Sequence, residues 1–194
     1  MLEWRELFLG AHMLLIERNA IATADPVDFA AFADHLRLEA TEAASALIYA
    51  STAAREIEDY CGLALLAQEI VAVSDPWPGQ VLRLPVGPAN PSGVPVVELI
   101  EGDGSLSPIT EGWTFHGGRY PTITFTGTPG GRLRVTYEAG FGGDSDALPR
   151  DLHHAIMDQA LRLYDRRGDM DSPATLAPSA ARIAARYRRV LVAA

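Results

Sequence analysis

The residues with the clearest chemical potential are the adjacent histidines His153 and His154, with Asp158 four residues after the second. Imidazole nitrogens and carboxylate oxygens bind Zn²⁺ or move protons near neutral pH. Adjacent residues on a helix point about 100° apart, so the two rings cannot easily bind one metal ion. A surface pair between His154 and Asp158 explains the same spacing. We therefore interpret the pattern as a helical pair, with a metal-dependent hydrolase as an alternative.

Other reactive side chains lack partners at a suitable spacing. The remaining histidines, His12, His35 and His116, show no ligand-like spacing. The single cysteine, Cys61, excludes an intramolecular disulfide and a multi-cysteine zinc site, and we expect it to pack at a helix end. No serine occupies a Gly-x-Ser-x-Gly turn. We therefore expect no catalytic residue, no metal site, no cofactor and no enzyme activity.

A glycine-rich loop, Gly140-Phe141-Gly142-Gly143, precedes Asp144 and Asp146 and could suggest a phosphate or calcium site. It lacks the Gly-x-x-x-x-Gly-Lys pattern of a phosphate loop and the spacing of an EF-hand. Apolar residues alternate over 132–138 before the loop, and they recur at helical spacing after Pro149. The loop is therefore interpreted as a turn from a strand to a helix.

The elements before this loop begin with two predicted helices. Asp25 as N-cap, Pro26 at the first helical position and Asp28 in the first turn predict a short helix to about Leu36. A longer helix is predicted over about 41–61, ending at Gly62. Its many alanines indicate close approach of neighbouring helices, either in a bundle or between subunits.

Between residues 65 and 138 the apolar pattern changes to the two-residue period of strands, with dense proline and glycine turns. The predicted fold class is α+β: a small α-helical bundle with an inserted antiparallel β-sheet domain. The expected domains are an N-terminal arm (1–24), a first helical part (25–64), the inserted β domain (65–140) and a second helical part (141–194). Strands are expected near 68–74, 81–84, 94–100, 112–115, 122–126 and 132–138.

Arginines concentrate in a last helix predicted over about 179–191. The net charge of −9 argues against a general nucleic-acid binder, whose affinity comes from neutralising phosphates. A local positive surface in such an acidic chain could dock an acidic protein partner or meet DNA. Aromatic residues of the β region could instead form a carbohydrate-binding platform, although core or loop packing is the simpler interpretation. These residues are Trp77, Trp113, Phe115 and Tyr120.

The order of these motifs resembles the head-tail connector, or adaptor, proteins of tailed bacteriophages and gene transfer agents. The resemblance rests on the strand, the Ala139-Gly140-Phe141-Gly142 turn, Pro149 and a helix ending Leu163-Tyr164-Asp165-Arg166-Arg167. The segment Asp34-His35-Leu36-Arg37-Leu38 and a long helix closing at Asp59-Tyr60-Cys61-Gly62 resemble the N-terminal half of that family. The resemblance covers most of the chain from about residue 27 onward.

The resemblance implies a structural protein that forms a dodecameric ring beneath the portal of a virion or phage-like particle. The ring would join the capsid to a stopper or other neck protein, and DNA would pass through it without sequence specificity. Assembly would take place in the bacterial cytoplasm, with no membrane involved; no apolar run is long enough to span a bilayer. Expected portal-binding residues are Arg182, Arg186, Tyr187, Arg188 and Arg189. The alternative is a β-sheet module that binds carbohydrate or protein.

Overall fold

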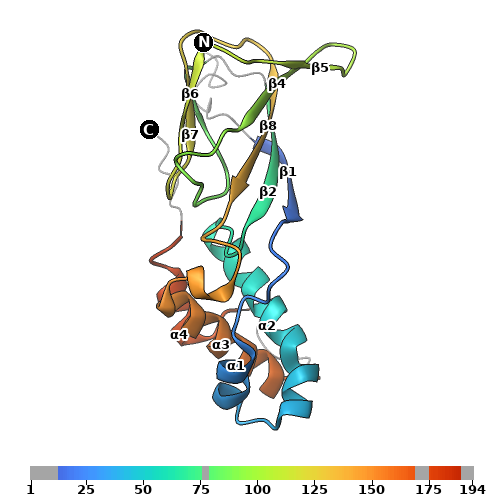
Figure 1. The fold of residues 1–194 in the computed structure, drawn as a ribbon, viewed down its shortest axis with the longest axis vertical. Coiled ribbons are helices and arrows are strands. Elements are labelled where there is room, and N and C mark those ends of the chain that lie inside the picture. Colours follow the sequence, from blue (N-terminus) through green and yellow to red (C-terminus); the bar gives the residue numbers. More distant parts are fainter. Residues whose placement is uncertain (1–12, 76–78, 169–174, 189–194) are drawn as a thin grey trace, which may run out of the picture. The chain divides into compact units, whose positions relative to one another are not determined.

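The computed structural model describes residues 13–75, 79–168 and 175–188, and the chain forms two compact units (Figure 1). The helical unit comprises described residues 20–67, 140–168 and 175–188. The β unit comprises 13–19, 68–75 and 79–139. The α+β class predicted from the sequence is confirmed, because antiparallel strands within residues 68–139 lie between two groups of helices along the chain, and a further strand at residues 13–20 precedes the first helix.

The helical unit begins with α1 (Phe29–Leu36), which starts three residues later than predicted. The N-cap is Asp28, whose carboxylate accepts a hydrogen bond from the Ala31 amide at 2.9 Å. Val27 and Phe32 occupy the two positions that form a hydrophobic staple around this cap, and both are buried in the same core. The prediction of Asp25 as the N-cap was wrong because the buried residues on both sides of Asp28 fix the entry of the chain there.

The other helices are α2 (Ala40–Cys61), a 3₁₀ turn η1 (Ser145–Ala147), α3 (Arg150–Asp165) and α4 (Pro178–Ala184). Gly62 ends α2 with φ 68°, a left-handed conformation that glycine adopts at little cost, as the sequence predicted. Within the parts of the chain that the structure describes, no helix combines the length and apolarity needed to cross a membrane.

Alanine is frequent in the core of the helical unit. The face of α2 that packs against α3 and α4 is rich in alanine, which lets neighbouring helices approach closely. These alanines therefore serve the bundle within one chain. Buried core residues of the three helices are Ala46, Ala50, Ala53, Ala54 and Ile57 of α2; Leu152, Ala155, Ile156 and Ala160 of α3; and Ala180, Ile183 and Ala184 of α4.

The β unit contains two sheets. A five-stranded sheet has the order β1-β2-β8-β4-β5, formed by Met13–Ala20, Gln68–Ser74, Arg132–Ala139, Val96–Ile100 and Leu106–Pro108. A three-stranded sheet has the order β3-β7-β6, formed by Val81–Arg83, Thr122–Phe125 and Trp113–His116. The pairs β2–β8, β8–β4 and β4–β5 are antiparallel, as are β3–β7 and β7–β6.

Strand β8 shows how the β unit forms its core. Leu133, Val135 and Tyr137 are buried and alternate with more exposed residues, as expected for a sheet with one face on the core. The Tyr137 hydroxyl donates to the Val86 carbonyl at 2.9 Å and accepts from the Val86 amide at 3.0 Å. The sheet thereby holds the segment that follows β3.

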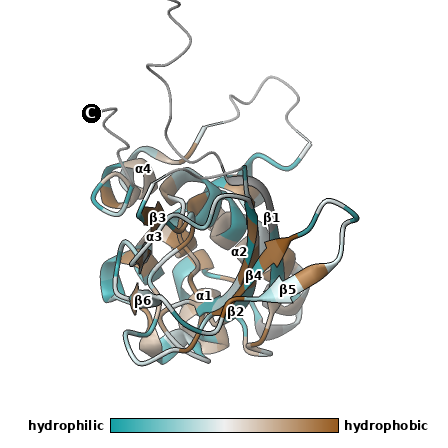
Figure 2. Cartoon of the chain, turned by 90° about the horizontal axis from the view of Figure 1, so that it is seen from above, coloured by the Kyte–Doolittle hydropathy of each residue, from teal (hydrophilic) through white to brown (hydrophobic). Residues whose placement is uncertain are grey.

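The β4–β5 hairpin exposes apolar side chains. Figure 2 shows hydrophobic residues along β4 and on part of the adjoining β5. Val94, Val96 and Leu106 are 87%, 51% and 41% exposed. Ile100 and Leu106 face each other in the register of the hairpin, so part of this apolar surface is continuous across two strands.

Candidate functional site

The basic C-terminal segment, which we define as residues 182–188, begins in the last turn of α4 (Pro178–Ala184) and continues past its end. The predicted helix over 179–191 is shorter in the structure, because α4 ends at Ala184 and turns follow. Cys61 anchors the end of α4, since its buried Sγ donates to the Ala184 carbonyl at 3.3 Å. This agrees with the expectation that Cys61 packs at a helix end. Arg189, one of the expected portal-binding residues, lies outside the described residues.

Asp151, in the first turn of α3, organises the segment after α4. One of its carboxylate oxygens accepts a hydrogen bond from the Tyr187 hydroxyl at 2.7 Å. The other lies 4.0 Å from a guanidinium nitrogen of Arg186. On the α2 side, the Arg188 guanidinium carbon lies 5.3 Å from the centre of the Tyr60 ring, within cation–π distance. Three of the expected residues, Arg186, Tyr187 and Arg188, therefore contact side chains of α2 or α3.

The expected portal-binding residues differ in how far their side chains are exposed. Arg182, Arg186 and Arg188 are exposed, and an exposed guanidinium can pair bidentately with a partner's carboxylate. Tyr187 is half-buried, with its hydroxyl engaged by Asp151. Ile183 is 4% exposed and belongs to the core of its own chain.

A second group of polar side chains joins α1 to α3; we call His35, His154 and Asp158 the histidine–aspartate cluster. The Nε2 atom of His35 lies 3.1 Å from one carboxylate oxygen of Asp158, and Nε2 of His154 lies 3.6 Å from the other. The two rings meet edge to face with centroids 5.9 Å apart. The predicted pairing of His154 with Asp158 is present, and His35 joins it.

His153 points elsewhere. Its Nε2 donates to the Ser145 carbonyl at 3.0 Å, so this ring stabilises η1 and takes no part in the cluster. The sequence correctly separated His153 from His154 by the angle between adjacent helical residues. It missed His35, which lies 123 positions before Asp158 and reaches it only because α1 packs on α3. No spacing in the sequence signals a contact at that range.

The glycine-rich loop performs the turn that the sequence predicted. Gly140 has φ 135°, and a Cβ there would overlap the Leu66 carbonyl. The Phe141 amide donates to the Leu65 carbonyl at 2.9 Å, and the Ala67 amide donates to the Gly142 carbonyl at 2.7 Å. These bonds hold residues 65–67 beside residues 141–142.

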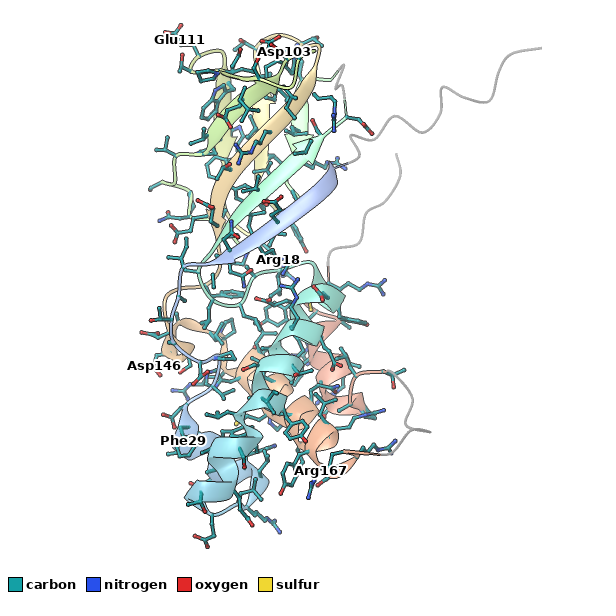
Figure 3. All side chains as sticks on the ribbon, turned by 90° about the vertical axis from the view of Figure 1, so that its right-hand side faces the viewer. Arg18, Phe29, Asp103, Glu111, Asp146 and Arg167 are labelled. Carbon is teal, nitrogen blue, oxygen red and sulfur yellow. The ribbon has the colours of Figure 1, made fainter. Side chains whose placement is uncertain are left out.

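The acidic residues after the glycines continue into helix structure. The Asp144 side chain caps η1 by accepting from the Ala147 amide at 3.3 Å. Asp146, labelled in Figure 3, lies within η1 itself. Both carboxylates therefore belong to the entry into α3, which gives the loop a structural explanation.

The aromatic residues of the β region do not form a flat exposed platform in the described part of that unit. The Trp113 indole is half-buried and donates to the Ile109 carbonyl at 2.7 Å. Phe115 is also half-buried, whereas Tyr120 is 48% exposed and carries the Arg119 guanidinium 5.3 Å from its ring centre. Trp77 lies outside the described residues. Packing of Trp113 and Phe115 against their own unit explains their positions.

Solved structures similar to this chain come from gene transfer agent (GTA) particles. The chain is 26% identical to a chain in the neck of an empty GTA particle computed with C6 symmetry, with a TM-score of 0.76. It has the same identity and TM-score against a chain in the virion of a native GTA particle. Against a chain in the neck of a native GTA particle computed with C12 symmetry, the identity is 25% and the TM-score 0.74.

Each of these similarities covers 92% of this chain and 97% of the other, so it extends over both units. No protein-family model matches the chain, and no curated protein matches its sequence.

Proposed function

We propose that this chain is a structural protein of the neck of a gene transfer agent or phage-like particle. The observation that carries the proposal is the similarity to a chain of a GTA neck, which extends over nearly the whole length of both chains at a TM-score of 0.76. A similarity confined to one unit would support only a shared building block. Its extent over the helical and β units supports a shared role for the complete arrangement of elements.

Within the neck, we propose that copies of the chain form a ring that acts as the adaptor beneath the portal. The C12 and C6 symmetries of the similar necks support a ring, since cyclic symmetry closes when each copy presents two different surfaces to its neighbours. The outer face of α2 suits such a contact. Ile48 is 65% exposed there, between small exposed residues such as Ser45 and Ser51. A dodecamer would match the twelvefold symmetry.

The acidic charge of the chain fits a ring around DNA. At a net charge of −9, each copy repels the phosphate backbone, so DNA can pass through the channel without adhering and without sequence recognition. The ring would contact a stopper or other neck protein on the side away from the portal. Particles would be assembled in the bacterial cytoplasm.

For the portal contact, we propose the exposed arginines at the end of the helical unit. Arg182, Arg186 and Arg188 present guanidinium groups to solvent, and Asp151 fixes the backbone that carries them through Tyr187. Arg189 continues the same basic run in the sequence. Acidic side chains on the portal would complement this charge and fix the orientation of the ring.

The test is native mass spectrometry of the chain alone and mixed with the portal protein of the same gene cluster. We expect a monomer or loose oligomer alone and a portal-bound ring in the mixture. In Arg182→Glu/Arg188→Glu, we expect the monomer to remain folded and portal affinity to fall at least about tenfold, because two attractive charges become repulsive. This pair is preferable to a change at Arg186, which lies beside Asp151.

A matched control replaces two arginines by glutamate elsewhere in the chain. Arg83 and Arg132 are exposed on strands β3 and β8, so Arg83→Glu/Arg132→Glu alters the net charge equally without touching the basic segment. We expect this control to keep portal binding. Equal losses in both double variants would point to a general charge effect and contradict the assignment. A stable monomer that ignores the portal would contradict the adaptor role itself.

A further inference from the structure

We propose that the histidine–aspartate cluster binds a divalent transition-metal ion, for which Zn²⁺ is the best fit. His35 lies in the last turn of α1, whereas His154 and Asp158 lie one turn apart on α3. One ligand atom from each of the three residues lies within 4.8 Å of the other two. The cluster lies entirely within the helical unit, so this proposal is independent of the neck role.

Two of the nitrogen–oxygen separations in the cluster are close to the ligand–ligand distance of a tetrahedral site, and all three ligand atoms lie within 4.8 Å of one another. The His35 Nε2 and His154 Nε2 atoms lie 3.1 Å and 3.6 Å from the two Asp158 oxygens. Tetrahedral Zn²⁺ with bonds of about 2.0–2.1 Å places neighbouring ligand atoms roughly 3.3 Å apart. Small rotations of the three side chains therefore suffice to bring one oxygen and both nitrogens onto one ion.

The orientation of the His35 and His154 rings favours a cation between these rings and the Asp158 carboxylate. Each imidazole directs Nε2 toward the same carboxylate. A metal ion between them would accept the Nε2 lone pairs, and the carboxylate would offset part of its charge. The ligand set also selects the ion, since two imidazoles suit Zn²⁺ whereas Mg²⁺ and Ca²⁺ prefer oxygen ligands.

Solvent can reach the cluster. The side chains of His35, His154 and Asp158 are 24%, 54% and 18% exposed. Three protein ligands leave a fourth position for water. Bound metal would join α1 to α3 across a long sequence separation. Because α1 has only eight residues and is too short to be stable alone, this additional link should stabilise its docking on the bundle.

The experiment uses the full chain without an affinity tag, freed of metal by chelator and dialysis. Isothermal titration with ZnCl₂ should show one ion per chain, and MgCl₂ should show no binding. Co²⁺ in place of Zn²⁺ should give the intense visible absorption of a tetrahedral site. Zn²⁺ should also raise the melting temperature, because it binds the folded state.

Single variants locate the site. His154 is more than half exposed, so His154→Ala should fold normally and bind Zn²⁺ at least about tenfold more weakly. His35→Ala should weaken binding similarly from the other helix. The matched control is His116→Ala, which removes an exposed histidine on β6 of the β unit and should leave binding unchanged. Circular dichroism verifies the fold of each variant.

Two results would overturn the proposal. One is a wild-type chain that binds no stoichiometric Zn²⁺, which would leave the cluster as a hydrogen-bonded group only. The other is folded His154→Ala that retains wild-type affinity and the Co²⁺ spectrum, which would place the bound ion elsewhere in the chain. Should His35→Ala fail to fold, His154→Ala still decides between these outcomes.

Discussion

Different interactions stabilise the interior of the helical unit and the interior of the β unit. In the helical unit, Gln159 is 1% exposed, donates to a Glu56 carboxylate oxygen at 2.6 Å and accepts from the Ala177 amide at 2.5 Å. It thus joins α2, α3 and the residue before α4. In the β unit the backbone ladders join the strands, and the buried residues are mainly apolar.

The difference follows from the size of the core residues. Alanine buries little apolar area, so an alanine-rich bundle gains less from burial than a sheet lined by leucine, isoleucine and valine. Directional hydrogen bonds then help to select one packing of the helices. Glu58 shows the same role, since its buried carboxylate accepts from the Leu65 amide at 2.7 Å just after α2. We therefore expect the helical unit to depend more on its buried polar side chains.

The largest effect is expected for Gln159→Leu. The change leaves the buried Ala177 amide and the Glu56 carboxylate without their partner, and each loss carries a desolvation cost. We expect the free energy of unfolding to fall by about 3 kcal/mol. Hydrogen exchange measured by mass spectrometry should show lost protection in the peptides of α2, α3 and α4.

The matched variant in the β unit is Tyr137→Phe. It removes one hydroxyl that serves both the amide and the carbonyl of Val86. We expect a loss of about 2 kcal/mol, with reduced protection confined to the β unit. A larger loss for Tyr137→Phe than for Gln159→Leu would show that the helical unit is not the more dependent of the two, and the comparison would be wrong.

The sequence predicted much of both units where local chemistry decides the structure. Strand β2 begins and ends at the predicted residues, and α2 ends at the predicted glycine. The sequence analysis did not predict β1 and β5, and each omission has an identifiable cause. Residues 13–16 form a continuous apolar run without two-residue alternation, and β1 is set by pairing with β2. Strand β5 is three residues long and contains Pro108, which is tolerated at the sheet edge.

The candidate sites show the same difference between features that local sequence determines and contacts that depend on packing between elements. The arginines after α4 were evident from their charge, but the burial of Ile183 depends on how α4 packs on the bundle. His154 and Asp158 were evident from helical spacing, whereas His35 required the contact between α1 and α3. Sequence patterns therefore identified residues on one element, and the packing of elements decided which of them meet.

An effect similar in size to that of Tyr137→Phe is expected at Gly140, where the chain passes from the β unit to the helical unit. Gly140→Ala places a side chain at φ 135° and against the Leu66 carbonyl, so the backbone must move. We expect a loss of about 2 kcal/mol in urea denaturation. Gly143→Ala is the control, because a Cβ at Gly143 meets no atom within 4 Å. Equal stability of the two variants would contradict the requirement for glycine at residue 140.

The smallest effect concerns the turn between β4 and β5, where Asp103 is labelled in Figure 3. The Ser105 hydroxyl and amide donate to its carboxylate at 2.6 Å and 2.9 Å, and these bonds lower the pKa of Asp103. A lowered pKa in the folded state means that the stabilisation is present above the unfolded pKa and is lost as the pH falls through the folded one. Because Asp103 is fully exposed, the loss should be local to the hairpin. NMR titration should find the Asp103 pKa below its ordinary value in the wild type and closer to that value in Ser105→Ala. If both proteins titrate at the same pH, the hydrogen bond from the Ser105 hydroxyl does not stabilise the ionised carboxylate.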